Sequence, residues 1–207
     1  VGKYATLQEA LTEIQNIDDC EMLYNITLGS DVKSAEFIFP SNAECIWIEG
    51  IGEMKNIHFK EELSVHSNVD FKNVNLVPDS ENGTLNINEY IVSIVDSKMK
   101  DNMTVVGNGN NCELHVASSE VTLKTLENVD ILSAYLDAKV TVGDDFTTKV
   151  LCMIRNATIC GLGTIQTEKI ECYGENTLVT VPANVKWVDG KITAMTSNLD
   201  ISGSLNT

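Results

Sequence analysis

Basic residues and long apolar runs are the first things that this sequence lacks. Its 207 residues carry 14 Lys+Arg against 30 Asp+Glu, which gives a formal net charge of −16. A surface this acidic repels phosphate backbones, so the composition argues against nucleic-acid binding, and against anionic polysaccharides unless cations mediate the contact. No stretch approaches the roughly 20 consecutive apolar residues that cross a bilayer. Hydrophobic residues still make up 43 % of the chain, which predicts a folded core.

The cysteines lack the spacing of a zinc or redox motif. None of the six forms a C-x-x-C pair. Cys152 follows Val150, and Cys172 follows Ile170, at the two-residue spacing of one strand face. We therefore expect buried thiols that act as small hydrophobic side chains, with disulfides as the alternative. The six positions are Cys20, Cys45, Cys112, Cys152, Cys160 and Cys172.

The start of the chain has a helical pattern. Thr6 and Glu9 fit a capping box, in which each side chain satisfies a backbone amide at the helix start. The apolar residues of this segment fall on one helical stripe. The pattern predicts an amphipathic helix over about residues 6–16. A helix this short is marginal alone in water, so it must lie against an apolar surface.

After about residue 19 a different unit repeats: an asparagine, an apolar residue, any residue, and a second apolar residue. Similar units without the asparagine lie between these. Each is a strand of a few residues with one apolar and one polar face. Asparagine tolerates the left-handed conformation of a sharp corner, and stacked asparagines can bond from layer to layer. The units begin at Asn25, Asn56, Asn68, Asn73, Asn128, Asn156, Asn184 and Asn198.

Many short strands separated by corners, in a chain with only three prolines, favour a solenoid. We predict an all-β fold, a right-handed single-stranded parallel β-helix with an N-terminal amphipathic capping helix. It forms a single domain over residues 1–207 with coils over about 23–203. A β-sandwich is the structural alternative, but it should show many hairpin turns of the kind seen at Asn82-Gly83 and Asp189-Gly190, and such turns are few.

The segment Tyr4-Ala-Thr-Leu-Gln-Glu-Ala-Leu11, the strand Tyr24-Asn-Ile-Thr-Leu28 and the repeated units resemble the pectin-lyase-like superfamily. The resemblance extends to surface proteins of gut bacteria that use this fold outside any pectinase family. It implies a β-helix covered by a helix at its N-terminal end, and a bacterial secreted or cell-surface location. The other end shows no comparable cap. We therefore expect a fragment of a longer secreted protein, or end-to-end association there.

The catalytic groups of that superfamily are mostly missing. Its lyases use an arginine or lysine beside calcium-binding acids, and this chain has one arginine, Arg155, which we interpret as a solvated charge. Its polygalacturonase-type hydrolases pair aspartates with Gly-His-Gly and Arg-x-Lys motifs. Asp144 and Asp145 resemble that pair, but neither motif is present. A turn after the strand at 140–142 is the simpler interpretation.

Histidine and tryptophan give no convergent site. We expect His58, His66 and His115 to lie exposed at outward strand positions, because no metal-ligand spacing joins them. No cofactor or metal site is predicted, although weak peripheral calcium stays open. Trp47 should point outward, as a sugar platform or, in the preferred interpretation, beneath a loop or the helix. Trp187 should lie in the core.

These observations predict a binding or structural role, with no catalytic, cofactor or metal residues assigned. The expected function is that of a non-catalytic secreted or cell-surface module acting in adhesion, glycan binding or spacing. Its expected partners are carbohydrate or a host or cell-surface protein. The alternative is a divergent polysaccharide hydrolase or lyase that uses surface carboxylates such as Asp144 and Asp145.

Overall fold

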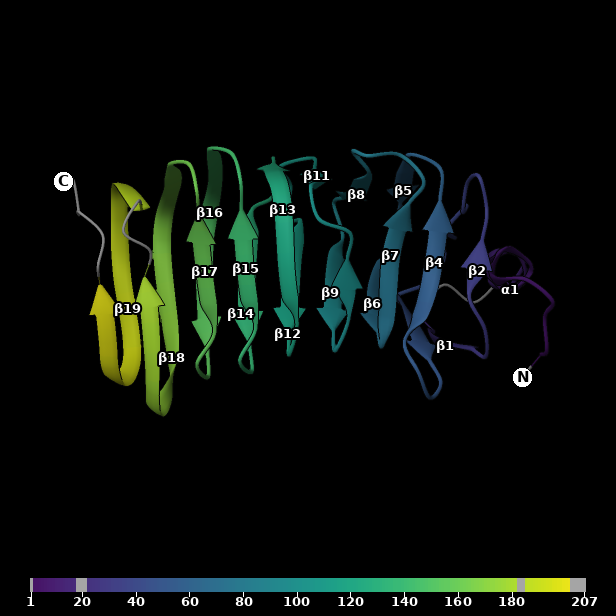
Figure 1. Ribbon diagram of the computed structural model, residues 1–207, viewed down its shortest axis with the longest axis horizontal. Coiled ribbons are helices and arrows are strands. Elements are labelled where there is room, and N and C mark those ends of the chain that lie inside the picture. Colours follow the sequence, from purple (N-terminus) through teal and green to yellow (C-terminus); the bar gives the residue numbers. More distant parts are fainter. Residues whose placement is uncertain (1, 18–21, 182–184, 202–207) are drawn as a thin grey trace.

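The computed structural model describes residues 2–17, 22–181 and 185–201, with side chains as far as Gly174 except at position 161. The chain winds into a parallel β-solenoid of about eight turns, preceded by one short helix (Figure 1). Every strand pair is parallel. The predicted β-helix is therefore confirmed and the β-sandwich is wrong.

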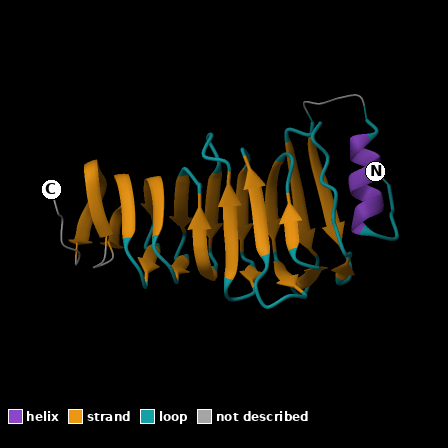
Figure 2. Ribbon diagram, turned by 90° about the horizontal axis from the view of Figure 1, so that it is seen from above, coloured by secondary structure: helices purple, strands orange, loops and turns teal. Residues whose placement is uncertain are grey.

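Helix α1 (Leu7–Gln15) lies across the N-terminal end of the coil stack (Figure 2). Its capping box forms as predicted, because the Thr6 side chain accepts a hydrogen bond from the Glu9 amide and the Glu9 carboxylate accepts one from the Thr6 amide. At the other end, the Asn42 side-chain amide donates to the carbonyl oxygens of Ile14 and Ile17. The apolar stripe is buried against the first coils and consists of Leu7, Ala10, Leu11 and Ile14.

The coils have three faces, which we call A, B and C in the order in which the chain visits them. Face A contains β1 (Leu23–Leu28), β3 (Cys45–Gly50), β6 (Asn68–Lys72), β9 (Ile91–Val95), β12 (Glu113–Ala117) and β14 (Ile131–Tyr135). Face B contains β2 (Val32–Lys33), β4 (Lys55–Phe59), β7 (Val74–Pro78), β10 (Lys98–Met99), β15 (Lys139–Val142) and β17 (Thr158–Gly161). Face C contains β5 (Glu62–Ser64), β8 (Thr84–Asn88) and β11 (Met103–Gly107).

Four longer strands turn a corner and belong to more than one face. They are β13 (Glu120–Glu127), β16 (Phe146–Ile154), β18 (Ile165–Val181) and β19 (Val185–Ile201). The first part of β13 pairs with β15 on face B, and its last residues pair with β11 on face C. The first residues of β16 pair with the start of β18 on face C, and its second half continues β14 on face A.

The core is a set of apolar columns that run along the coil axis. On face A, Leu114 pairs with Val92 in the preceding coil and with Leu132 in the next, and all three side chains are fully buried. Inward residues alternate with outward ones along each strand, as the period-two units predict. Each inward side chain is thus buried by its counterparts above and below.

The corner between faces A and B repeats one backbone conformation in successive coils. From β6 to β16, the residue that follows the face A strand of each coil has a positive φ, and its amide donates to a carbonyl of the next coil. Asn73 is an asparagine, as predicted for a corner, whereas the corner residues of the later coils are of other types. The stacked backbone hydrogen bonds hold this conformation whatever the side chain. The corner residues are Asn73, Asp96, Ser118, Leu136 and Arg155.

The asparagine prediction is confirmed for Asn73, Asn128 and Asn156, which all have positive φ. Contact between coils also forms, because the Asn75 side-chain amide donates to the Asn56 side-chain oxygen at 2.9 Å. The corner prediction is wrong for Asn25, Asn56 and Asn68. These residues belong to strands β1, β4 and β6, and none of them has a positive φ. Asn184 and the side chain of Asn198 lie outside the described residues.

The five described cysteines are free, as predicted: Cys112, Cys152 and Cys172 are buried, and Cys45 and Cys160 are partly exposed. Cys172 is in the core, whereas Cys152 lies on the outer surface of face A and is covered by its neighbours. Burial raises the pKa of both thiols to about 11. Cys20 lies outside the described residues. So do residues 202–207, on which the predicted uncapped C-terminal end depends.

Candidate functional site

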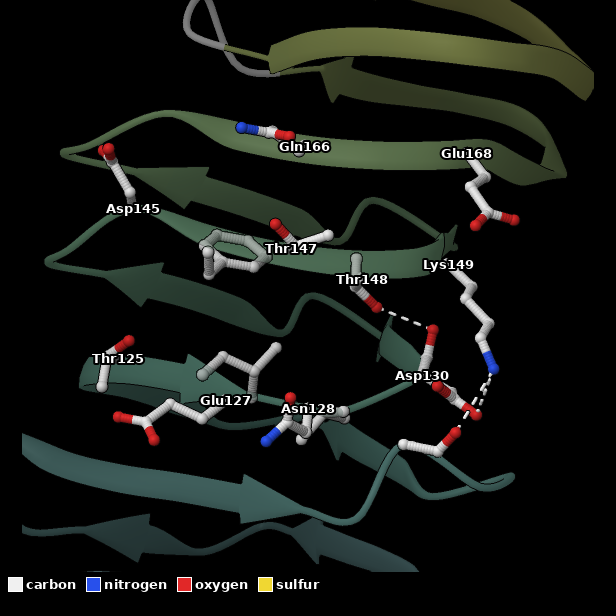
Figure 3. A pocket seen from close by; sticks show the side chains of 14 residues that line it. Thr125, Glu127, Asn128, Asp130, Asp145, Thr147, Thr148, Lys149, Gln166 and Glu168 are labelled. Atoms are coloured by element: carbon white, nitrogen blue, oxygen red, sulfur yellow. Dashed lines mark hydrogen bonds and ion pairs between the residues drawn. The ribbon is translucent and has the colours of Figure 1, made fainter.

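A polar groove of about 600 Å³ crosses face C near the corner with face A (Figure 3). A cavity of this size is within the usual range of small-ligand sites. Its walls come from three successive coils, because β13, β16 and β18 each contribute residues. Its lining is Gly109, Thr125, Leu126, Glu127, Asn128, Val129, Asp130, Asp145, Phe146, Thr147, Thr148, Lys149, Gln166 and Glu168.

The groove lies where the coils become shorter. From Val92 to its partner Leu114 the chain takes 22 residues, but from Leu114 to its partner Leu132 it takes 18. The connection from face C to face A shrinks in step. It spans residues 108–112 between β11 and β12, spans 128–130 between β13 and β14, and is absorbed into β16 in the next coil. Gly109 of the longer loop therefore lines one side of the groove, next to the coils with shorter connections.

Asp130 fixes the end of the groove nearest face A. Its carboxylate accepts a hydrogen bond from the Asn111 amide at 2.7 Å and pairs with the Lys149 ammonium at 2.9 Å. Its carbonyl oxygen accepts a bond from the Thr148 hydroxyl, so one buried residue joins three coils (Figure 3). The hydrogen bond to Asp130 raises the pKa of Lys149. This carboxylate is occupied by structural contacts.

The middle of the groove has the opposite character. Within the described part of the chain, no side-chain hydrogen bond or ion pair is formed by Thr125, Glu127, Thr147 or Gln166. Thr147 and Gln166 are Cα partners on adjacent strands, so a hydroxyl and an amide lie side by side. All four side chains project from the outer surface of face C, among the other residues of the groove (Figure 3). They are free to donate or accept hydrogen bonds with a bound molecule.

Asp144 and Asp145 lie in the connection between β15 and β16, which confirms the predicted turn. The Asp145 carboxylate accepts a hydrogen bond from the Thr164 amide of the next coil at 2.6 Å. Asp145 lines the groove, whereas Asp144 is not among its lining residues. The pair is therefore divided, with one carboxylate used to order the neighbouring turn.

The three histidines lie apart. His58 is at an outward position of β4 on face B, and His115 is at an outward position of β12 on face A, as predicted. His66 is exposed, but it lies in the turn after β5 and not in a strand. His115 is only partly exposed, because Glu113 lies 2.7 Å from its Nε2 and Tyr135 contacts its ring edge. The described residues contain no group of three or more metal-ligating side chains.

Trp47 differs from the preferred interpretation. It projects outward from β3 and is 40 % exposed, so neither helix α1 nor a loop among the described residues covers it. The Lys72 ammonium lies 5.6 Å from its ring centroid and is held by Glu49 at 2.9 Å. Trp47 thus offers an aromatic surface, but on face A and away from the groove. The side chain of Trp187 lies outside the described residues.

Arg155 has the predicted role of an exposed charge, at the corner after β16. Among the described helices, none is long and apolar enough to cross a membrane.

Comparisons with protein-family models, curated proteins and solved structures give no significant match. The assignment to the parallel β-helix class therefore depends on the topology of the chain itself. The groove was not predicted from the sequence. Its free side chains come from positions about 20 residues apart, and only the winding of the coils brings them together.

Proposed function

We propose that this protein is a non-catalytic β-helix module that binds carbohydrate in the groove on face C. The observation that supports this is the group of uncommitted hydroxyl, amide and carboxylate side chains at Thr125, Glu127, Thr147 and Gln166. Sugars present hydroxyl groups that both donate and accept hydrogen bonds, and planar amides and carboxylates match them. The secreted or cell-surface location that the superfamily resemblance implies is part of this proposal.

Charge selects the class of glycan. The chain has a formal net charge of −16, and Lys149, the one basic residue of the groove, is already paired with Asp130. Uronic-acid or sulfated chains would be repelled, because the residues that line the groove include no unpaired cation to compensate their charge. The ligand is therefore a neutral oligosaccharide, lying across the three coils that build the groove.

A binding assay with matched variants tests this proposal. Calorimetry with neutral gluco-, manno-, xylo- and chito-oligosaccharides of four to six units should show binding to at least one. Thr147→Arg places a large side chain in the groove and should weaken that binding at least tenfold. Thr84→Arg makes the same change on β8, at an outward position of face C two strands away from Thr125, and should leave it unchanged. Equal effects of the two variants, or no binding at all, would reject the groove.

Trp47→Ala separates this site from the aromatic surface on face A. If binding is lost in Trp47→Ala and kept in Thr147→Arg, carbohydrate binds at Trp47 and the proposed site is wrong. The opposite result supports the groove.

Polysaccharide cleavage is the second candidate, because Glu127, Asp145 and Glu168 line the same groove. Two carboxylates can act as an acid and base pair on a glycosidic bond. Assays for new reducing ends and for unsaturated products, with neutral and acidic polysaccharides, decide between the two functions. Release of products that is abolished by Glu127→Gln or Asp145→Asn would replace the binding function with a hydrolase or lyase.

A further inference from the structure

The outer surface of face A is apolar where a solvated sheet should be polar. In β9, β12, β14 and β16, eight of the twelve outward residues are apolar, and Glu113 and His115 are the acidic and basic residues among them. The Glu113 carboxylate is held by His115. We call this surface the face A strip. Its apolar members are Ile91, Val95, Ala117, Ile131, Tyr135, Val150, Cys152 and Ile154.

The sequences of these strands have the pattern of strands covered on both sides. The segments 91–95, 131–135 and 150–154 read Ile-Val-Ser-Ile-Val, Ile-Leu-Ser-Ala-Tyr and Val-Leu-Cys-Met-Ile. Near-continuous apolar runs of this kind are typical of strands with no solvated face. Segment 84–88 on face C reads Thr-Leu-Asn-Ile-Asn and alternates as a strand with one wet face should. The inner side of the strip is covered by the core, and its outer side has no cover among the described residues.

We propose that the face A strip is a self-association surface, on which a second copy of this chain packs face to face. Charge favours a second copy on this face, because elsewhere two chains of net charge −16 repel each other. The strip has a single carboxylate. On the neighbouring strands of the same face, four charges are paired as Glu49–Lys72 and Lys169–Glu171, and Asp70 of β6 is the one outward charge without an ion pair among the described residues. This proposal does not depend on carbohydrate binding, which concerns face C.

A twofold arrangement pairs most apolar residues of the strip with apolar residues of the second copy, and it places Glu113 opposite Ile131. A twofold axis parallel to the strands, between β12 and β14, exchanges these two strands and also exchanges β9 with β16. Tyr135 then lies opposite Ala117 of the second copy, so that a large side chain meets a small one. The aliphatic pairs are Ile91 with Val150 and Val95 with Ile154. Such a twofold contact uses the same patch on both copies, as closed dimers do.

The size of the strip sets the strength of the contact. Four strands at about 4.8 Å spacing, each about 16 Å long, cover roughly 300 Å² per copy, or roughly 600 Å² in the pair. Stable dimers bury about 1,200 Å² or more, so this surface supports a weak and reversible dimer. We expect a dissociation constant of roughly 10 µM to 1 mM. Added salt should strengthen the dimer, because it screens the repulsion between the other faces.

Sedimentation equilibrium from 5 µM to 1 mM protein, at low and high salt, tests the proposal. Wild type should shift from monomer to dimer over this range. Ile131→Glu places a carboxylate in the strip and should raise the dissociation constant at least tenfold. Thr122→Glu adds the same charge at an outward position of β13 on face B and should change it less than threefold. Val150→Thr keeps the branched shape and provides a second strip variant, should Ile131→Glu fail to fold.

Three outcomes would overturn the proposal. Wild type that stays monomeric at 1 mM and high salt removes the self-association. A dimer that neither strip variant weakens uses another surface. A dimer that Thr122→Glu weakens as much as Ile131→Glu responds only to total charge. Circular dichroism of each variant at 5 µM checks that the β-helix is intact.

Discussion

Faces A and C are built from the same coils and the same core, yet their outer surfaces are opposites. Face A presents branched aliphatic and aromatic side chains over β9, β12, β14 and β16. Face C presents mainly threonine, asparagine, glutamate and glutamine over β8, β11 and the first residues of β16 and β18, with Val106 as an outward apolar residue of β11. The inner residues of all faces thus stabilise the same core, whereas the outer residues differ from face to face and determine what each face can bind.

The largest expected effect tests whether the two faces share one core. Leu114 on face A and Leu85 on face C are both fully buried. Leu114→Ala and Leu85→Ala should each lower the free energy of unfolding by about 2–5 kcal/mol, because each leaves a cavity in a column of stacked side chains. Urea unfolding of both variants provides the measurement. A loss below about 1 kcal/mol for either variant would show that its face contributes little to the core.

The next effect separates structural from free carboxylates in the groove. Asp130→Ala leaves the Asn111 amide and the Lys149 ammonium without their partner, and should cost about 2–3 kcal/mol in unfolding free energy. Glu127→Ala removes a side chain without described partners and should change it by less than about 0.5 kcal/mol. Thermal and urea unfolding of the two variants should differ accordingly. Similar losses would contradict the division of the groove into fixed and free residues.

A smaller effect compares two buried serines at different corners. Ser97, between faces A and B, accepts a bond from the Val74 amide at 3.0 Å and donates to the Val95 carbonyl at 2.7 Å. Ser97→Ala should therefore cost about 1–2 kcal/mol. Ser67, between faces C and A, is equally buried, but its hydroxyl has no hydrogen-bond partner among the described residues. Ser67→Ala should leave stability unchanged or raise it. Destabilisation by both would refute this distinction.

The smallest effect concerns a corner that bounds face A. Leu136 has φ 52° and is 42 % exposed. Its left-handed backbone is therefore strained, and the partial burial of its side chain offsets little of that strain. Leu136→Asn should raise the free energy of unfolding by about 1 kcal/mol, because asparagine tolerates this conformation better. The control is Leu162→Asn, which is more exposed and is not among the positive-φ residues. Equal changes in melting temperature would mean that removal of exposed leucine, and not backbone strain, causes the effect.

The fold could be predicted from the sequence because its determinants are local. The capping box at Thr6 and Glu9 and the short period-two units are visible within a few residues. The corners were predicted only in part. At Asp96, Ser118 and Arg155 the backbone ladder between coils stabilises the left-handed conformation, and this ladder leaves no trace in the residue type.

The surfaces were harder to predict because they arise between coils. Thr147 and Gln166 become neighbours only when the coil length is known. The change from 22 to 18 residues per coil, which creates the groove wall, follows from strand register and not from a motif. The apolar outer surface of face A was visible as the runs at 131–135 and 150–154. The sequence of such a run does not indicate whether both of its sides are buried or one of them faces outward, because that depends on the winding of the coils.

The central claim is that face C, and not face A, binds carbohydrate. Amide chemical-shift mapping of the isotope-labelled protein, during titration with the neutral oligosaccharide that binds best, tests it directly. The account predicts shifts confined to residues 125–130, 145–149 and 166–168. Shifts clustered around Trp47 on β3, with the groove silent, would contradict it.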